Sequence, residues 1–241
     1  MKRVGLGLAL LCLVCGGVTA SAQDKYPSRP VKVVVPYAPG GASDITARLF
    51  GEQMRQSLGQ QFVVENKPGA FGILAIEEMA RSKPDGYTLM VGNVTTNAIT
   101  PVLFAKKFSI NFEKDVVSVS RLAIYPSFLL TTTQNFEPKS VAELIAYAKK
   151  NPGKVNLGHA GVGTLHWQSM LAPAQTPKEV LATLFKAIVE AAGAPQLQEA
   201  FQKQFVSAKP NASLQEAQSW LDGELAAWRK TVAEVKIELA D

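Results

Sequence analysis

The sequence predicts an α/β protein built on a mostly parallel sheet with helices on both faces. Strand-like and helix-like segments alternate from residue 31 to residue 158, in units that suit strand–helix–strand repeats. Polar or glycine-rich loops follow three of the predicted strands, at residues 37–44, 93–97 and 159–164. Because ligands of such folds lie at the carboxyl ends of the strands, these three loops are the candidate binding site.

The first unit is the most informative part of the chain. Residues 31–35, VKVVV, form a buried-strand run that stops at Pro36, and the loop 37–41 follows. Ser43 or Asp44 is then expected to cap a helix. Free backbone N–H groups and the helix dipole favour an anion at such a helix N-terminus. An ordinary strand-to-helix connection is the alternative interpretation, because every α/β fold contains such turns.

The other elements follow from the same kinds of pattern. Capping boxes that start at Ser140 and Ser213 predict two helices. The C-terminal third is helical, and Trp220 and Trp228 follow the helical spacing expected of core residues. The predicted strands are residues 62–66, 87–91, 116–123, 128–132 and 154–158, and the predicted helices are residues 73–81, 141–150, 176–191, a second C-terminal helix that ends at 205, and a long helix from 213.

The N-terminus predicts export from the cytoplasm. Lys2 and Arg3 precede an apolar run at residues 4–14, and Ala20-Ser21-Ala22 forms a small-residue cleavage site. This pattern is typical of a secretory signal peptide and is too short for a spanning helix. We therefore expect cleavage near Ala22 and a periplasmic protein, with an uncleaved anchor as the alternative.

Composition excludes several classes of function. Both cysteines, Cys12 and Cys15, lie in the signal peptide, so the mature chain has no disulfide and no thiol chemistry. Removal of Lys2 and Arg3 lowers the formal charge from +5 to +3, without any run of basic residues. Nucleic-acid binding is therefore not predicted, whereas a slightly positive surface suits a small anion.

The chain offers little for catalysis. It has two histidines, His159 and His166, and no HExxH, GxSxG or paired-carboxylate signature. The histidines could be metal ligands, but no third ligand lies nearby, so loop histidines that hydrogen-bond or face solvent are favoured. Asp44 could be a general base, although a helix-capping role is favoured. We expect a protein that is not an enzyme and has no cofactor and no metal.

Several motifs carry a family resemblance. From Tyr26 to the C-terminus, the segments YPSRPVKVVVPYAPGGASDITARLFGEQM, VVENKPGAFG, KPDGYTLMVGNVTTNAITP, PKSVAELIAYAKKNPGKVNLGHAGVGT, LAPAQTPKEV and SLQEAQSWLDGELAAWRK resemble the Bug family in the same order. These are the extracytoplasmic solute-binding receptors of tripartite tricarboxylate transporters. The resemblance implies a two-lobed, type II periplasmic-binding-protein-like fold, small carboxylate ligands held largely by backbone amides and water, and membrane transporter subunits as partners.

Carried over to this chain, the resemblance places carboxylate-binding residues in the same three loops. Two loops belong to the first lobe and one belongs to the second. The implied ligand-binding residues are Tyr37, Ala38, Pro39, Gly40, Gly41 and Asp44 in the first loop, Asn93, Thr95, Thr96 and Asn97 in the second, and His159, Gly161, Gly163 and Thr164 in the third.

Some residues of these loops depart from the family pattern. His159 and Ala160 stand where the family usually has serines, so a hydroxyl donor is lost in the second-lobe loop. Asn97 stands in place of a usual histidine, and Thr100 in place of a usual asparagine.

The largest departure lies between His166 and Trp167. Compared with an ordinary two-lobed receptor, roughly 80 residues are missing here, nearly all from the second lobe. The remainder is too small for an independent core. A true deletion, a misassembled gene and a natural variant would all give this sequence.

The expected organisation therefore has three parts. Residues 1–22 form the signal peptide, residues 23–125 and 171–241 form a near-complete first lobe with the C-terminal helices, and residues 126–170 form the remnant of a truncated second lobe. We expect a monomer. Three functions remain as hypotheses: a carboxylate receptor, a degenerate receptor that no longer binds, and, least supported for want of catalytic residues, a periplasmic enzyme.

Overall fold

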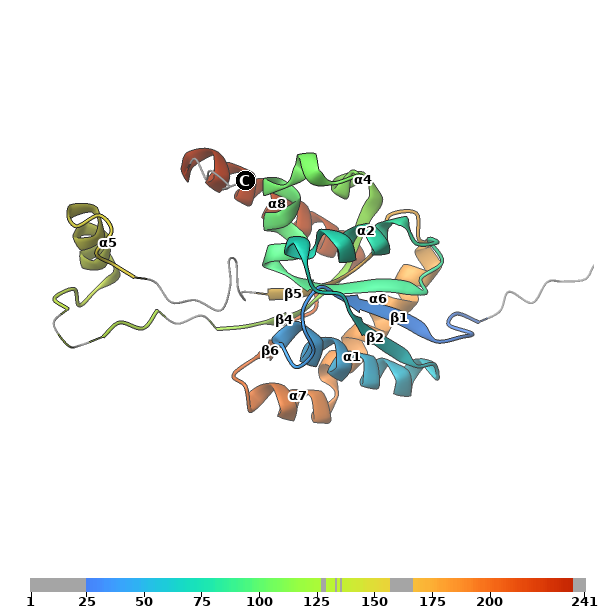
Figure 1. Cartoon of the computed structure of the whole chain (residues 1–241). Helices are drawn as coiled ribbons and strands as arrows, with labels where there is room; N and C mark the ends of the chain where they lie inside the picture. The colour runs from blue at the N-terminus through green and yellow to red at the C-terminus, as the bar shows by residue number, and fades with distance from the viewer. Residues whose placement is uncertain (1–24, 127–128, 133, 135, 157–166, 236–241) are drawn as a thin grey trace, which may run out of the picture.

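A six-stranded sheet with the order β2-β1-β3-β5-β4-β6 forms the centre of the structure (Figure 1). The computed structural model describes residues 25–126, 129–132, 134, 136–156 and 167–235. The strands are β1 (Val31–Val35), β2 (Phe62–Asn66), β3 (Thr88–Asn93), β4 (Val116–Ile124), β5 (Trp167–Pro173) and β6 (Ser207–Ala208). The helices are α1 (Ala42–Leu58), α2 (Ile73–Arg81), α3 (Thr100–Leu103), α4 (Phe112–Asp115), α5 (Val141–Lys150), α6 (Lys178–Gly193), α7 (Pro195–Gln202) and α8 (Leu214–Val235), with the short turns η1 (Ala70–Gly72), η2 (Thr95–Ile99) and η3 (Ala105–Lys107).

The sheet is mixed. β1 pairs in parallel with β2 and β3, whereas β5 runs antiparallel to both of its neighbours, β3 and β4, and β6 runs antiparallel to β4. Strands β1 to β4 therefore run in one direction, as a mostly parallel sheet predicts. The pairings are less parallel than predicted, because β5 lies between β3 and β4.

Strand β5 corrects the boundary drawn from the sequence. All seven of its residues are buried, and it joins the parallel half of the sheet to the antiparallel half. Residues 167–170, assigned from the sequence to the second-lobe remnant, thus belong to the main sheet. Side chains of β5 enter the apolar cores on both faces of the sheet, with Met170 on one face and Trp167 and Leu171 on the other.

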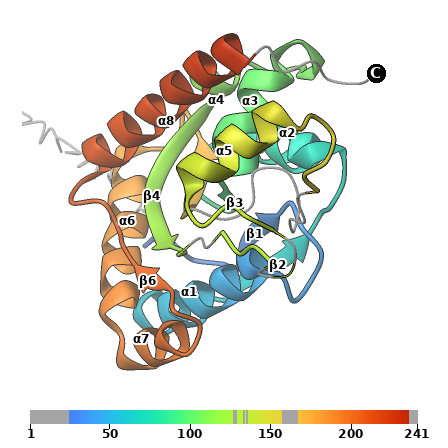
Figure 2. The same ribbon diagram turned by 90° about the vertical axis from the view of Figure 1, so that its left-hand side faces the viewer.

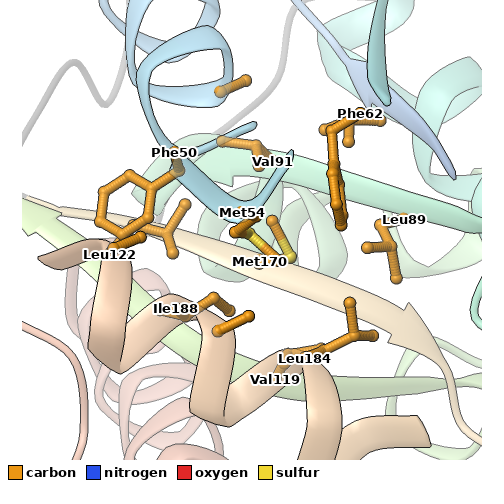
Figure 3. Close-up of a cluster of buried hydrophobic side chains, with 14 of the residues drawn as sticks. Phe50, Met54, Phe62, Leu89, Val91, Val119, Leu122, Met170, Leu184 and Ile188 are labelled. Atoms are coloured by element: carbon orange, nitrogen blue, oxygen red, sulfur yellow. The ribbon is translucent and has the colours of Figure 1, made fainter. Parts of the chain in front are cut away.

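Two apolar cores cover the two faces of the sheet. Helices α1, α6 and α7 pack on one face, where Phe50 and Met54 of α1 meet Leu184 and Ile188 of α6 above Met170 of β5 (Figure 3). Helices α2 and α8 pack on the other face together with η2. The described helices include no single one that is long and apolar enough to cross a membrane, although α6 and α7 would meet that test together if their 62° bend is ignored.

The long C-terminal helix supports the prediction that its tryptophans are core residues. Trp220 and Trp228 are partly buried and pack against the core formed by α2 and α8. The rings of Trp220 and Trp167 meet edge to face, with centroids 4.4 Å apart. Ser213 caps α8, since its Oγ accepts a hydrogen bond from the N–H of Glu216 at 3.0 Å.

Residues 125–166 form an insertion that leaves and re-enters the sheet at one place. Ile124 at the end of β4 pairs with Trp167 at the start of β5. Since β4 runs in the same direction as β1 and β3, both ends of the insertion lie at the carboxyl edge of these strands. Its described part extends away from the sheet and carries α5 (Figure 1), which lies in front of the β1–β3 edge in the turned view (Figure 2).

The insertion has little tertiary packing where it is described. α5 has no buried residue, and its apolar Val141 and Ile145 are 60% and 50% exposed. The predicted capping box is present, since Ser140 Oγ accepts from the N–H of Glu143 at 3.2 Å. The strands predicted at 128–132 and 154–158 are absent at residues 129–132 and 154–156, and the rest of both segments lies outside the described residues. Local capping holds α5, but the structure gives those strand-like runs no neighbour to pair with.

We predict that limited digestion with trypsin cuts first after Lys149 or Lys150. A ten-residue helix without buried side chains is marginal in water and opens readily. The two fragments should stay together on size exclusion, because β5 is held between β3 and β4. Lys186, whose side chain is 79% exposed on the packed helix α6, is the control. Cleavage after Lys186 as early as in α5 would contradict the prediction.

Candidate functional site: the carboxyl edge of the parallel strands

The first two predicted loops meet at the carboxyl edge of the sheet. β1 and β3 are parallel neighbours, so the chain after Val35 and the chain after Gly92 emerge side by side. The Tyr37 hydroxyl donates a hydrogen bond of 2.7 Å to Asn93 Oδ1. Burial raises the pKa of Tyr37, against the effect of its hydrogen bonds to the second loop, so the hydroxyl stays protonated and can donate. The third predicted loop, with His159, Gly161, Gly163 and Thr164, lies outside the described residues.

Helix α1 begins without a side-chain cap. Its N-cap is Gly41, and neither Ser43 nor Asp44 caps it as the sequence predicted, because both lie inside the first turn. Asp44 instead reaches back, and its Oδ2 accepts a hydrogen bond of 2.9 Å from the N–H of Gly40. The first backbone N–H groups of a helix have no partner within the helix. With no side-chain cap at Gly41, the first turn of α1 presents amides to an anion at this edge.

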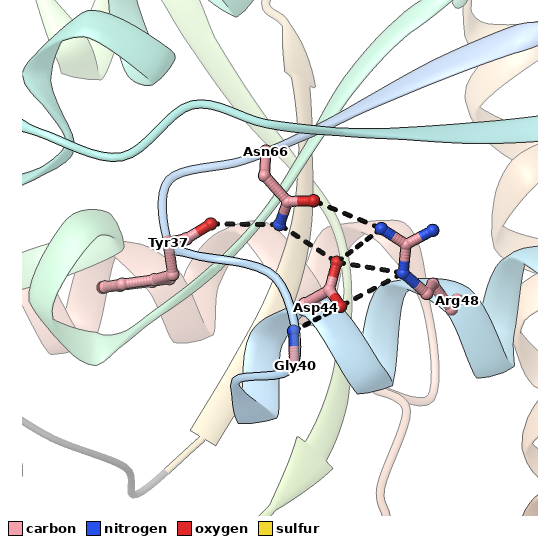
Figure 4. A network of polar contacts seen from close by, with 5 residues as sticks. All are labelled: Tyr37, Gly40, Asp44, Arg48 and Asn66. Carbon is pink, nitrogen blue, oxygen red and sulfur yellow. Dashed lines mark hydrogen bonds and ion pairs between the residues drawn. The ribbon is translucent and has the colours of Figure 1, made fainter.

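The Asp44 carboxylate holds this loop in place (Figure 4). It accepts hydrogen bonds of 3.0 Å from Arg48 Nε and 3.0 Å from Asn66 Nδ2, besides the bond from Gly40. Asn66 Nδ2 also donates to the Tyr37 carbonyl at 3.0 Å, and Arg48 donates to Asn66 Oδ1 at 3.2 Å. One carboxylate therefore joins the loop after β1, the first turns of α1 and the end of β2.

Asp44 is a supporting residue in this arrangement. Its side chain is only 4% exposed, and both of its oxygens accept hydrogen bonds. Burial alone would raise the pKa of Asp44, but hydrogen bonds from Arg48, Gly40 and Asn66 hold it below its ordinary value. The group is thus an anion near neutral pH and is paired with Arg48, so it is poorly suited to contact an anionic ligand or to act as a general base.

The second predicted loop forms a buried corner after β3. Thr96 and Asn97 are fully buried. Thr96 Oγ1 donates to Asn97 Oδ1 at 2.8 Å, and Asn97 Nδ2 donates to Ser169 Oγ of β5 at 2.8 Å. Asn93 and Thr95 lie closer to the surface, and the N–H of Thr95 donates to Asn93 Oδ1 at 2.9 Å. The side chains of Thr96 and Asn97 therefore hold the corner together, while Asn93 and Tyr37 lie at the edge.

Two glycines make this corner possible, and the sequence analysis did not single them out. A Cβ on Gly92 would lie 2.2 Å from Asn97 Oδ1 and 2.3 Å from Thr96 Oγ1. A Cβ on Gly72, whose φ is +87°, would lie 2.4 Å from Thr96 Cγ2. Asn66 was also missed as a site residue. The available signal was the position of Asn66 and Gly92 near the carboxyl ends of two apolar strands.

The described residues contain no group of three or more histidine, cysteine, aspartate or glutamate side chains that could hold a metal ion. Both histidines lie outside the described part of the chain. What the described edge offers is a set of backbone amides and neutral hydroxyl and carboxamide groups around a neutralised carboxylate. Such a set can hold an anion by hydrogen bonds.

Comparison with known proteins places the chain in a family. The family described as "Tripartite tricarboxylate transporter family receptor" matches residues 46–167. The chain belongs to this family. It is 36% identical over 158 residues to a UPF0065 protein of Bordetella pertussis, covering 65% of this chain and 47% of the relative. It is 30% identical over 164 residues to BugT of the same organism, covering 68% and 50%.

The chain spans about half the length of the curated relatives it matches. This shortness fits the internal gap inferred from the sequence.

Solved structures share the fold. One titled as a periplasmic transporter has a TM-score of 0.70 at 25% identity, covering 89% of this chain and all of that one. A Rhodopseudomonas palustris protein with adipate has a TM-score of 0.73 at 20% identity, with 88% and 99% covered. MatC from that organism, with bound malate, has a TM-score of 0.68 at 21% identity, with 86% and 100% covered.

We predict that Asp44→Asn lowers the free energy of unfolding by about 2–3 kcal/mol at pH 7, since it weakens charge-assisted bonds in a buried network. The folded pKa of Asp44 is depressed, so its contribution is complete above the unfolded pKa of about 3.9 and is lost as pH falls through the lower folded value. The difference between variant and parent should therefore shrink below about pH 4. Urea unfolding at several pH values measures it.

Glu52→Gln on the same helix is the control for that series. Glu52 pairs with Arg55, but its side chain is 51% exposed, so its loss should change stability little. Equal and pH-independent effects of the two substitutions would show that the Asp44 network does not stabilise the fold.

A second prediction concerns the neighbouring glycines, Gly40 and Gly41. Gly40 has a φ of +82°, whereas Gly41 has an ordinary φ of −76°. An added Cβ meets no atom within 4 Å at Gly40 and only an ordinary contact of 3.5 Å at Gly41. Gly40→Ala should therefore cost about 1–2 kcal/mol through its backbone conformation alone, and Gly41→Ala should cost much less. Thermal unfolding of both variants tests this, and equal Tm values would refute the loop conformation.

Proposed function

We propose that this chain is a periplasmic solute-binding receptor that captures a small carboxylate for a tripartite tricarboxylate transporter. The observation that carries the proposal is the first turn of α1, which has no side-chain cap because Asp44 within that turn accepts a hydrogen bond from the preceding loop at Gly40 instead. Family membership supports a receptor, and two proteins of similar fold have adipate and malate as their ligands. The N-terminal signal pattern with cleavage near Ala22 supports a periplasmic location.

Recognition in this proposal rests mainly on the first lobe. The carboxylate would accept hydrogen bonds from the amides around Gly41, with the Tyr37–Asn93 pair beside it. His159 to Thr164, which lie outside the described residues, would supply the second-lobe loop. The partners of the receptor would be the membrane subunits of the transporter. We propose that the receptor is a monomer without a catalytic role, a cofactor or a metal.

The affinity should be low compared with that of a full-length relative. A two-lobed receptor gains affinity when its lobes close and exclude water from the ligand. Each lost charge-assisted hydrogen bond costs about 1.5–3 kcal/mol, so losing two or three weakens binding at least about a hundredfold. The rival proposal is a degenerate receptor that binds nothing, and the unpacked α5 favours it, because nothing described covers the face that a second lobe would bury.

Calorimetry on the mature chain distinguishes these proposals. We expect weak binding of malate or adipate, and none of the corresponding diamides, because the amides of α1 require an anion. Gly40→Val should abolish this binding. Gly153→Val is the matched control, since Gly153 also has positive φ and open space but lies after α5 in the insertion.

Three results would count against the carboxylate receptor. The first is that no carboxylate of a broad panel binds, and the second is that the diamides bind as well as the acids. The third is that Gly40→Val and Gly153→Val have the same effect on affinity. The first result favours the degenerate receptor, and the other two place binding elsewhere.

A further inference from the structure

Two buried side chains in the described part of the chain make no hydrogen bond: Gln168 and Ser118. Gln168 is fully buried, and neither its Nε2 nor its Oε1 has a partner. An unsatisfied buried amide costs free energy, so most such groups in native proteins are bonded. Gln168 therefore needs a reason to be where it is.

Its place in the sheet puts Gln168 at the candidate site. It lies opposite Asn93 of β3 and opposite Ala123 of β4. Side chains alternate along a strand, and Met170 and Ala172 face the core under α1. Gln168 therefore faces α1 as well, on the side of the sheet where its register partner Asn93 receives the Tyr37 hydroxyl.

Other polar groups at this edge of the sheet are already bonded. Tyr37 donates to Asn93, and the hydroxyls of Thr46 and Tyr125 lie 2.6 Å apart. Tyr125 follows β4 and also donates to the Ala42 carbonyl at 3.4 Å, which brings the start of α1 over this end of the sheet. Gln168 thus lies on the face of the sheet that α1 covers, in register with Asn93 at the edge where α1 begins, and its carboxamide has no partner. Two independent features, free amides and an unpartnered buried side chain, meet at one edge.

We propose that Gln168 is a specificity residue that recognises a hydroxyl group beside the carboxylate of the ligand. This inference rests on the proposed carboxylate-binding function. A carboxamide supplies two donors and one acceptor, so Nε2 can donate to a carboxylate oxygen while Oε1 accepts from a neighbouring hydroxyl. A 2-hydroxycarboxylate satisfies both at once, whereas a plain dicarboxylate satisfies only Nε2. Gln168 is fully buried in the free protein, so the proposal requires its side chain to rotate toward the edge when the ligand binds.

The test compares malate with succinate, which lacks the hydroxyl. Gln168→Met keeps the length of the side chain and removes its polar atoms. We expect the Tm of the free protein to stay equal or rise, because an unsatisfied group is removed. We expect both affinities to fall, with the loss for malate about tenfold larger than the loss for succinate. Malate loses its bonds with both Nε2 and Oε1, whereas succinate loses only its bond with Nε2. Gln168→Leu, measured in the same way, replaces Gln168→Met if that variant does not fold.

Ser118→Ala is the matched control. Ser118 Oγ is the other buried atom without a partner, but it lies toward the opposite end of β4. Its removal should leave both affinities unchanged. If the parent protein binds, equal losses for malate and succinate in Gln168→Met, or no loss for either, would overturn the role of Gln168. The proposed function would still stand. A parent that binds neither ligand would overturn the proposed function, and the role of Gln168 with it.

Discussion

The Asp44 carboxylate is the interaction on which the candidate site depends. Three segments converge on it: the loop after β1 through Gly40, helix α1 through Arg48, and the end of β2 through Asn66. By accepting the N–H of Gly40, Asp44 orders the loop without occupying the helix end itself. Its charge is balanced by Arg48, so the first turn of α1 keeps its attraction for a second, external anion. An aspartate at the N-cap position would itself have accepted hydrogen bonds from the first amides of α1, which would then not be available to an external anion.

Strand β5 is the constraint that joins this site to the rest of the chain. It lies between β3 and β4, and its start pairs with the end of β4. The insertion of residues 125–166 therefore leaves and returns beside the candidate binding edge. In a two-lobed receptor this is where a second lobe would stand over the ligand. Here the described part of the insertion is an extended segment with the unpacked helix α5. The chain therefore supplies little of the second wall that would close a binding cleft.

Many of the helices and strands could be predicted from local sequence. The apolar runs of β1 and β2, and the capping residues Ser140 and Ser213, encode their elements within a few residues. The prediction failed where a segment depends on distant partners. Residues 129–132 and 154–156 have strand-like sequences, but strands need neighbours, and none is present for them in the described structure. Likewise nothing local shows that Asp44 bonds Asn66, or that Gln168 lies opposite Asn93, because both depend on which strands become neighbours.

The central claim is that the first turn of α1 binds a carboxylate through its backbone amides. The most direct measurement follows the amide chemical shifts of the ¹⁵N-labelled mature chain while malate is added. The account predicts that the amides of Gly41, Ala42 and Ser43 shift most and along one saturable curve, while those of α5 stay unchanged. Saturable shifts confined to other parts of the chain, or no saturable shift at these three amides, would contradict it.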